Sequence, residues 1–124
     1  MKKVTSGDEM YAWAEDLFPI CRSLTGSGVR DTLSYLKNLL PTLNMHEIKT
    51  GENVLDWQVP LEWDIKDAYI ENEKGKKIID FNTSNLHVVG YSEPIDTILD
   101  LAELQKHLHS LPSLPNAIPY ITSY

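Results

Sequence analysis

The chain has 124 residues, of which 42% are hydrophobic and 23% are charged, and its formal net charge is −7. This composition is ordinary for one globular domain or a piece of a larger one, and it excludes a largely disordered chain. The absence of any run of about 18 apolar residues excludes a transmembrane helix, and the acidic balance argues against nucleic-acid binding. A single cysteine and the lack of an apolar signal segment favour the cytoplasm.

The first predicted element is an amphipathic helix that ends near Pro19. Ser6 and Glu9 have the spacing of a capping box, in which each side chain bonds the other residue's backbone amide. From Met10 to Phe18, apolar residues then recur at the intervals of one helix face. Proline lacks the amide hydrogen that a helix interior needs, so Pro19 is expected to end or kink the helix.

A second amphipathic helix is predicted to start near Ser27 or Gly28 and to stop at Pro41. Its apolar positions share one face: Val29, Leu33, Leu36 and Leu40. Neither helix is polar on all sides, so both apolar faces are expected to dock on another surface. A homo-oligomer formed through these faces is one way of covering them.

After the second helix the apolar period shortens, which predicts strands. Residues 43–50, 54–59 and 86–90 are each expected to form one. The clearest pair is 67–71 with 77–81, joined by a loop whose glycine comes late in the turn. That arrangement is typical of a type I turn with a bulge, so the predicted β region is mostly antiparallel.

The last predicted element is a short helix capped by Asp100, with leucines repeating as far as Leu111. The proline-rich residues 112–119 cannot form regular structure and are expected to lead into an extended segment, 120–124. A strand-like segment that reaches the last residue is what a chain cut in the middle of its fold would show.

These elements predict an α+β fold of two amphipathic helices, a small mostly antiparallel β region and a short helix. The change of period divides the chain into a helical segment, residues 1–50, and a β-rich region, residues 51–124.

Four histidines are candidates for a metal site: His46, His87, His107 and His109. The last two lie two residues apart on the predicted short helix, so their side chains would point about 200° apart and would not bind one ion. Neither a His-Glu-x-x-His nor a Cys-x-x-Cys spacing occurs. Four unrelated histidines at surface or half-buried positions are therefore favoured over a metal site.

The loop between the two predicted helices holds other candidates. Cys21 beside Arg22 could serve as a nucleophile, but no histidine lies near it in the sequence, so a structural role is favoured. Hydroxyl groups and glycines share this loop: Ser23, Thr25, Ser27, Gly26 and Gly28. They suggest phosphate binding, but their spacing fits no phosphate motif, so a helix–helix connection with its own caps is preferred. Arg22 and Arg30 are expected to pin it by hydrogen bonds to carbonyl or acidic groups.

Aromatic residues occur in or near the predicted strands: Trp57, Trp63, Tyr69 and Phe81. They are expected to form the core of a small sheet, and an aromatic ligand groove is the alternative. The basic run at 74–77 is better explained by a hairpin turn than by a nucleic-acid contact. The sequence thus predicts no catalytic, cofactor-binding or metal-binding residue in this chain.

Several segments taken together resemble a known family. They are LFPICRSLTG at 17–26, GVR at 28–30, DWQVP at 56–60, EW at 62–63, DAYI at 67–70, NLHVVGYS at 85–92, LHSLP at 108–112 and AIPYITSY at 117–124. The pattern is similar to the N-terminal part of bacterial aminopeptidase-like proteins that carry a domain of unknown function. Some members of that family are described as polysaccharide biosynthesis proteins with an aminopeptidase-like domain.

The resemblance implies a piece of an α/β fold like that of zinc exopeptidases, with the helices packed on its core and a β-rich insert after them. It also implies hydrolysis of peptide or amide bonds by zinc-bound water in the full-length protein. The family's metal ligands and acid/base carboxylate would follow Tyr124, so no such role passes to a residue of this chain. The implied cofactor of the whole protein is zinc, with none in this chain.

Two hypotheses follow. In the first, the chain is the N-terminal segment of a zinc-dependent aminopeptidase-like hydrolase, is inactive alone, and has the rest of that polypeptide as its partner. In the second, it is a self-contained α+β binding or interaction module without catalytic activity. Neither hypothesis involves a nucleic acid or a membrane.

Overall fold

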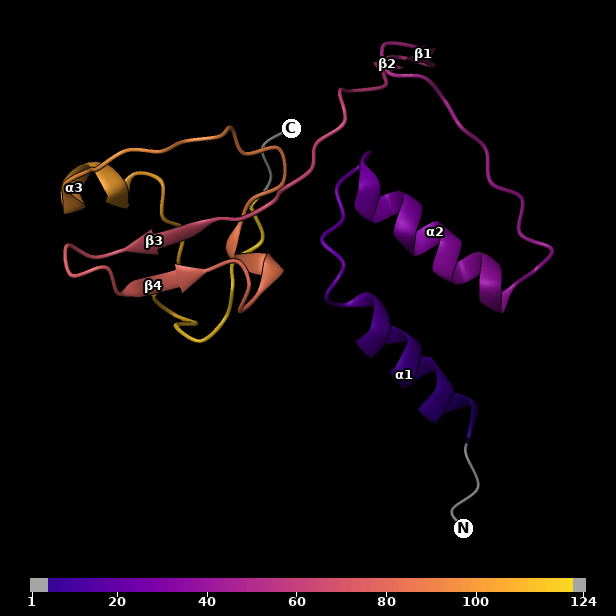
Figure 1. The fold of residues 1–124 in the computed structure, drawn as a ribbon, viewed down its shortest axis with the longest axis horizontal. Helices are drawn as coiled ribbons and strands as arrows, with labels where there is room; N and C mark the ends of the chain where they lie inside the picture. Colours follow the sequence, from indigo (N-terminus) through magenta and orange to yellow (C-terminus); the bar gives the residue numbers. More distant parts are fainter. Residues whose placement is uncertain (1–4, 122–124) are drawn as a thin grey trace. The chain divides into compact units, whose positions relative to one another are not determined.

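The computed structural model describes residues 5–121 and divides the chain into two compact units, Met1–Asp67 and Ala68–Tyr124. The first unit contains helices α1 and α2 and the hairpin of β1 and β2 (Figure 1). The second contains the hairpin of β3 and β4, a short 3-10 helix and helix α3. The predicted domain boundary between residues 50 and 51 concerns the organisation of the whole family protein and stays a prediction.

Helix α1 spans Ser6–Leu17, and its capping box begins one residue earlier than predicted. Thr5 is the last extended residue, with φ −101° and ψ 161°, and is therefore the N-cap. The Asp8 amide donates to Thr5 Oγ1 at 3.3 Å, and the Thr5 amide donates to Asp8 Oδ2 at 2.8 Å. This backbone hydrogen bond is the main reason why the pKa of Asp8 is lowered. The predicted pair Ser6 and Glu9 is thus wrong, because both residues already lie inside the helix.

Helices α1 and α2 end before Pro19 and Pro41, as predicted. Phe18 caps α1, and its amide donates to the Ala14 carbonyl at 2.9 Å directly before Pro19. Helix α2 spans Ser27–Leu39, and Leu40 caps it before Pro41. Start and end of α2 are therefore as predicted.

The prediction of one strand over residues 54–59 is wrong. The chain instead folds back on itself, so that β1 (Asn53–Val54) pairs antiparallel with β2 (Trp57–Gln58). The turn begins at Leu55, whose φ of 57° lies in the left-handed region. The side chain of Leu55 is 99% exposed.

The predicted strands at 43–50 and 86–90 are also wrong. The first segment has no regular structure, and the second begins within a 3-10 helix, Asn85–His87. A strand needs a neighbour to satisfy its backbone amides and carbonyls, and neither segment has one within the described residues. An alternating pattern alone does not supply that neighbour.

The hairpin of β3 (Tyr69–Glu71) and β4 (Lys77–Asp80) confirms the clearest strand prediction. The pairing is antiparallel. The bulge is predicted at the turn, where the Gly75 amide donates to the Asn72 carbonyl at 2.8 Å. A separate register shift, which is not predicted, lies between Ile70 and Glu71. Gly75 has a φ of 71°, a conformation that glycine adopts without the steric cost other residues bear.

Helix α3 spans Leu101–Gln105 and is capped by Asp100, whose carboxylate accepts from the Glu103 amide at 2.9 Å. The helix is shorter than its leucine repeat suggests and ends before His107. Residues 112–119 form turns without a helix or strand, as predicted. Of the predicted extended segment, residues 122–124 lie outside the part of the chain that is described.

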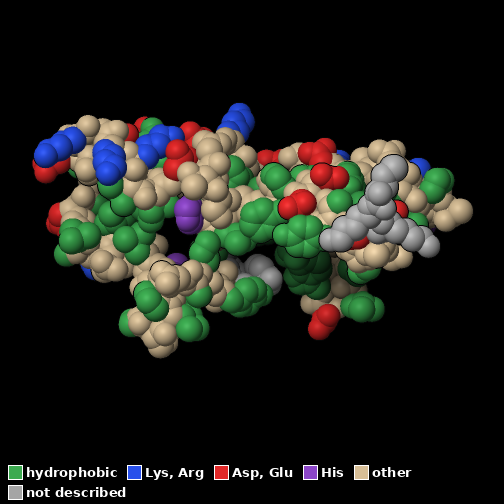
Figure 2. Space-filling model, turned by 90° about the horizontal axis from the view of Figure 1, so that it is seen from below, with side chains coloured by type: hydrophobic (Ala, Val, Ile, Leu, Met, Phe, Trp, Pro, Cys, Tyr) green, Lys and Arg blue, Asp and Glu red, His purple; other side chains and the backbone are tan. Residues whose placement is uncertain are grey.

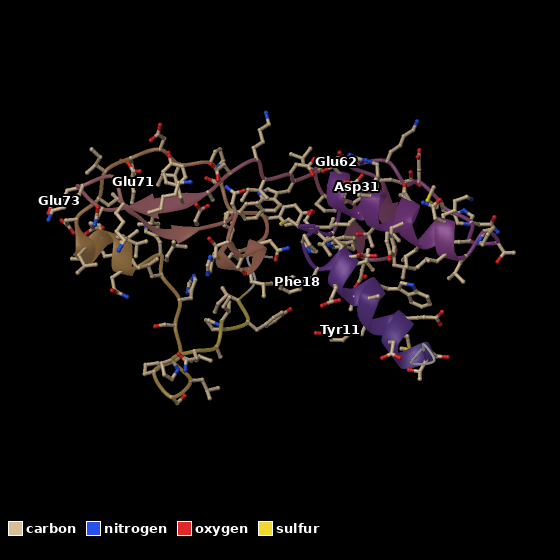
Figure 3. All side chains as sticks on the ribbon, turned by 60° about the horizontal axis from the view of Figure 1, so that its bottom comes forward. Tyr11, Phe18, Asp31, Glu62, Glu71 and Glu73 are labelled. Carbon is tan, nitrogen blue, oxygen red and sulfur yellow. The ribbon has the colours of Figure 1, made fainter. Side chains whose placement is uncertain are left out.

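Between residues 5 and 121 no hydrophobic side chain is buried, and the two buried residues are Gly26 and Gly28. Apolar side chains lie instead on the surface over both units (Figure 2). On α1, Tyr11 and Phe18 project away from the helix (Figure 3). The fold class is α+β, as predicted. The apolar face of α1 is mostly exposed, whereas Val29, Leu33 and Leu36 on α2 are half-buried.

The aromatic core is not present in the described chain. Trp57 in β2 is 53% exposed and Tyr69 in β3 is 51% exposed, while Trp63 and Phe81 are half-buried. Trp57 and Tyr69 lie in two separate two-stranded sheets. No helix within the described residues is long and apolar enough to cross a membrane.

Candidate functional site

The densest polar contact lies where the loop between α1 and α2 meets a distant segment of the first unit. We call residues 61–64 the strap, and residues 22–30 the helix loop. The strap follows the β1–β2 hairpin, and its side chains and carbonyls contact the helix loop across more than 30 intervening residues.

Two hydroxyl groups of the helix loop bind carbonyl oxygens of the strap. Ser23 Oγ donates to the Trp63 carbonyl at 3.2 Å, and Thr25 Oγ1 donates to the Leu61 carbonyl at 3.1 Å. The Ser23 hydroxyl is also directed at the Thr25 carbonyl. These hydroxyls thus hold the strap in place along its length.

Asp64 binds the first residue of α2 through two hydrogen bonds. The Ser27 amide donates to Asp64 Oδ1 at 2.8 Å, and Ser27 Oγ donates to the same oxygen at 2.6 Å. The Ser27 hydroxyl and then its amide stabilise the carboxylate, so the pKa of Asp64 is lowered.

Glu62 and Arg30 form a two-pronged ion pair beside this cap. Arg30 Nη1 lies 2.5 Å from Glu62 Oε1, and Arg30 Nη2 donates to Glu62 Oε2 at 3.0 Å. Their mutual hydrogen bond lowers the pKa of Glu62 and raises that of Arg30. The side chain of Glu62 is 50% exposed and that of Arg30 is 57% exposed, so solvent weakens their attraction. The pair therefore orients the strap more than it stabilises the fold. Figure 3 marks Glu62 and Asp31 near the start of α2.

Two glycines allow close backbone contacts here, Gly26 with the strap and Gly28 with Cys21. A Cβ at Gly26, where φ is 119°, would lie 2.6 Å from the Trp63 carbonyl oxygen and 2.8 Å from Asp64 Oδ1. A Cβ at Gly28 would lie 1.9 Å from the carbonyl oxygen of Cys21. Neither separation is possible for real atoms, so both positions require glycine.

The arginines flank the loop and pin it, as predicted. Arg22 Nη1 donates to the Leu17 carbonyl at 2.8 Å, which ties the loop to the end of α1. Arg30 binds the acidic Glu62. A further tie joins the helices, because the Tyr35 hydroxyl donates to Asp16 Oδ2 at 2.7 Å.

Sequence reasoning missed the strap itself. The sequence feature that could have indicated it is the missing cap of α2. Gly26 precedes α2 and offers no side-chain acceptor for the free amides of the first turn. An acceptor from elsewhere was therefore required, but the sequence does not show which of 18 acidic residues supplies it.

The chemistry of the loop is structural. Its hydroxyl groups donate to carbonyls or to Asp64, and the carboxylate of Asp64 occupies the position at the start of α2 where a phosphate would bind. The loop does connect α1 and α2, but the prediction that it carries its own cap is wrong, because Gly26 makes no side-chain cap and Asp64 of the strap supplies one.

The histidines are scattered over both units. His46 is exposed in a segment without regular structure, and His87 Nδ1 lies 3.1 Å from the Asp80 carbonyl oxygen. His107 and His109 lie beyond the end of α3, so the premise that they share a helix is wrong. Residues 5–121 bring together no group of three side chains able to hold a metal ion, so a zinc site does not fit them.

Cys21 is half-buried, and this burial is the main reason why the pKa of its thiol is raised. A raised pKa lowers the thiolate fraction at neutral pH, and the thiolate is the reactive species. We expect iodoacetamide at pH 7.5 to alkylate Cys21 more slowly in the native chain than in the urea-denatured chain. Equal rates, measured by mass spectrometry, would contradict the burial.

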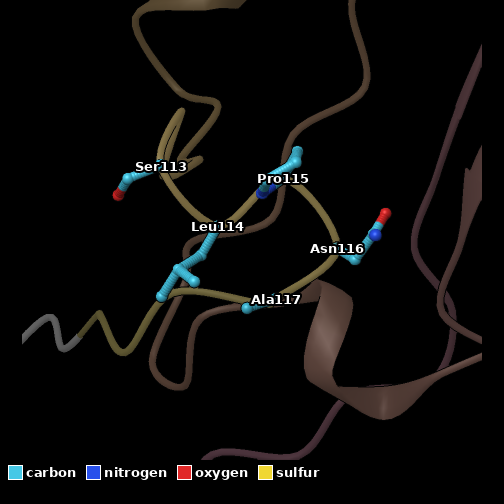
Figure 4. A pocket seen from close by; sticks show the side chains of 5 residues that line it. All are labelled: Ser113, Leu114, Pro115, Asn116 and Ala117. Atoms are coloured by element: carbon cyan, nitrogen blue, oxygen red, sulfur yellow. The ribbon is translucent and has the colours of Figure 1, made fainter.

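A shallow depression of about 290 Å³ lies within the turn of residues 113–117 (Figure 4). Its lining residues are Ser113, Leu114, Pro115, Asn116 and Ala117. They are consecutive in sequence and include no titratable group, and the side chains of Ser113 and Asn116 point away from one another (Figure 4). The depression is a feature of the turn and offers no chemistry.

These observations define a helix-and-hairpin segment whose polar contacts serve its own architecture. The family described as "Domain of unknown function (DUF2172)" matches residues 62–124, which is 63 of the 124 residues. The chain therefore belongs to this family, and the match begins at Glu62, within the strap.

A relative from Clostridium acetobutylicum, "Putative polysaccharide biosynthesis protein with aminopeptidase-like domain", is 51% identical over 119 residues. The alignment covers 96% of this chain and 27% of the relative. The crystal structure of a "putative peptidase" from the same organism is similar with a TM-score of 0.91 and 51% identity, over 96% of this chain and 28% of that one. The chain thus spans about a quarter of the length of these relatives, and the resemblance found in the sequence is confirmed.

Proposed function

We propose that this chain is a scaffold segment of a longer, zinc-dependent aminopeptidase-like hydrolase and catalyses no reaction by itself. The observation that carries the proposal is that no hydrophobic side chain between residues 5 and 121 is buried. An autonomous enzyme forms its site in a cleft walled by packed apolar side chains. The names of the two similar proteins supply the class of reaction, the hydrolysis of peptide or amide bonds.

The zinc ion of such a hydrolase would be held outside the described residues. A catalytic zinc site needs three protein ligands that converge on one point, and residues 5–121 offer no such group. The contribution of this chain is therefore to position other parts of the polypeptide.

The partner of the exposed helix faces is the rest of the same polypeptide. Met10, Tyr11 and Phe18 on α1 are exposed, and the relatives are nearly four times as long as the region they share with this chain. Complete burial of one such large apolar side chain stabilises the folded polypeptide by roughly 1.5–3 kcal/mol. We place the protein in the cytoplasm because the single cysteine of this chain has no partner for an internal disulfide.

Zinc analysis and a hydrolysis assay test the proposal. We expect the purified chain, after dialysis, to hold far less than one equivalent of zinc by mass spectrometry and to leave an aminoacyl p-nitroanilide intact. The full-length relative from Clostridium acetobutylicum, treated identically, is expected to retain zinc and to release nitroaniline.

Two results would contradict the proposal, one for the missing metal site and one for the assigned reaction. One tightly bound equivalent of zinc in the chain alone would show that the chain holds a metal site. A full-length relative that neither binds zinc nor cleaves any aminoacyl amide would refute the assigned reaction.

A further inference from the structure

Helix α2 lacks a cap of its own. Its N-cap residue is Gly26, which makes no side-chain hydrogen bond to the helix, and its first turn carries no acidic residue. The amides of a first turn have no partner within the helix and favour a negative charge. In this chain both requirements are met from the strap, because Asp64 accepts from the amide and the hydroxyl of Ser27.

The strap also lies at the start of the family region, which matches from Glu62 onward. The side-chain hydrogen bonds of Glu62 and Asp64 reach back to residues before that boundary, namely Arg30 and Ser27. The first residues of the family region are thus structurally part of the helical segment.

We propose that the strap and helix α2 form one conformational switch, in which Asp64 caps the helix from a distance and Glu62 holds Arg30, so that α2 is fully formed only while the strap is docked. The helix loop is shaped for the docked state at Gly26, where a Cβ would lie 2.6 Å from the Trp63 carbonyl oxygen of the strap. The switch concerns conformation, so it stands or falls independently of zinc binding and hydrolysis.

Low pH is expected to undock the strap from the start of α2. The groups that face Asp64 are Ser27, Arg30 and Glu62. Asp31 adds to the negative charge near Arg30. The charge of Asp64 also contributes to the raised pKa of Cys21. Docking lowers the pKa of Asp64 and of Glu62. Both carboxylates therefore stabilise the docked state above their ordinary pKa, near 4, and this stabilisation is lost as the pH falls through the lowered values.

Amide hydrogen exchange and backbone NMR of the 124-residue chain test the switch. We expect Asp64→Ala to speed the exchange of the α2 first-turn amides roughly two- to tenfold at pH 7 and to shift the Ser27 amide resonance. Asp64→Asn removes the charge, as protonation does, but keeps an oxygen acceptor, so its first-turn amides should exchange faster than in the unmodified chain and more slowly than in Asp64→Ala. The Ser27 resonance should then change much less on acidification than in the unmodified chain.

Asp96→Ala is the matched control, because Asp96 is exposed in a segment without regular structure and belongs to the other unit. It should change neither the exchange nor the Ser27 resonance. The proposal is overturned if Asp64→Ala behaves like Asp96→Ala. It is also overturned if the Ser27 resonance changes as much with pH in Asp64→Asn as in the unmodified chain, or if α2 is not helical at pH 7 in the unmodified chain.

Discussion

Heating the 124-residue chain alone is expected to give a broad loss of helical signal, with strong binding of a hydrophobic dye already at 25 °C. The reason is that no hydrophobic side chain between residues 5 and 121 is buried, so no packed core makes unfolding cooperative. A cooperatively folded chain of this length would show an unfolding enthalpy of roughly 85 kcal/mol. We expect a value well below half of that from circular dichroism or calorimetry.

This measurement separates the two hypotheses raised by the sequence. A self-contained module would melt sharply and bind little dye, as would a compact globular protein of the same mass run as a control. A dimer formed through the helix faces would give a transition that moves to higher temperature as the chain concentration rises. The sharp transition would count against a segment that depends on the rest of its polypeptide, whereas the concentration-dependent transition would count against the self-contained module.

Gly28→Ala is expected to have the largest effect of any single substitution in the first unit. The added Cβ would lie 1.9 Å from the Cys21 carbonyl oxygen, and a backbone atom cannot move aside as a flexible side chain can. Overpacking of this kind costs about 2 kcal/mol, which corresponds to a roughly thirtyfold shift away from the closed helix loop. Faster exchange of the α2 amides and a weaker helical signal at 222 nm would report it.

Gly7→Ala is the control for this substitution. Gly7 also lies near the start of a helix, but a Cβ there would meet only Thr5 Oγ1, at an ordinary contact distance of 3.7 Å. We expect it to leave α1 unchanged or slightly more stable, because alanine favours helices over glycine. If Gly28→Ala were tolerated equally well, the close approach at Cys21 would be disproved.

The elements that the sequence predicted well are those determined by neighbouring residues. Helix α2 runs from Ser27 to a stop before Pro41 because periodicity and proline act locally. The β3–β4 hairpin has its strands and Gly75 within one short stretch, so pairing is also local. The one-residue error at Thr5 arose because several polar residues in a row can each serve as a cap.

The wrong predictions share a different cause. Segment 54–59 alternates like a strand, yet Leu55 adopts a left-handed conformation and begins a turn. Leucine is not a residue type that indicates a turn in a sequence. The strap depends on Glu62 and Asp64 reaching Ser27 and Arg30 far back in the chain. Such partners are selected by the path of the backbone in three dimensions, which a single sequence does not reveal.

Each sheet in the described residues has two strands, so every strand has an open edge. Open edges invite strands of other molecules and are a common origin of aggregation. The turn of the β3–β4 hairpin is flanked by charged side chains: Glu71, Glu73, Lys74 and Lys76. A strand from another molecule would have to displace their water, whereas a strand of the same polypeptide meets the edge at a far higher effective concentration. The charges at this end of the hairpin therefore oppose pairing with a strand of another molecule.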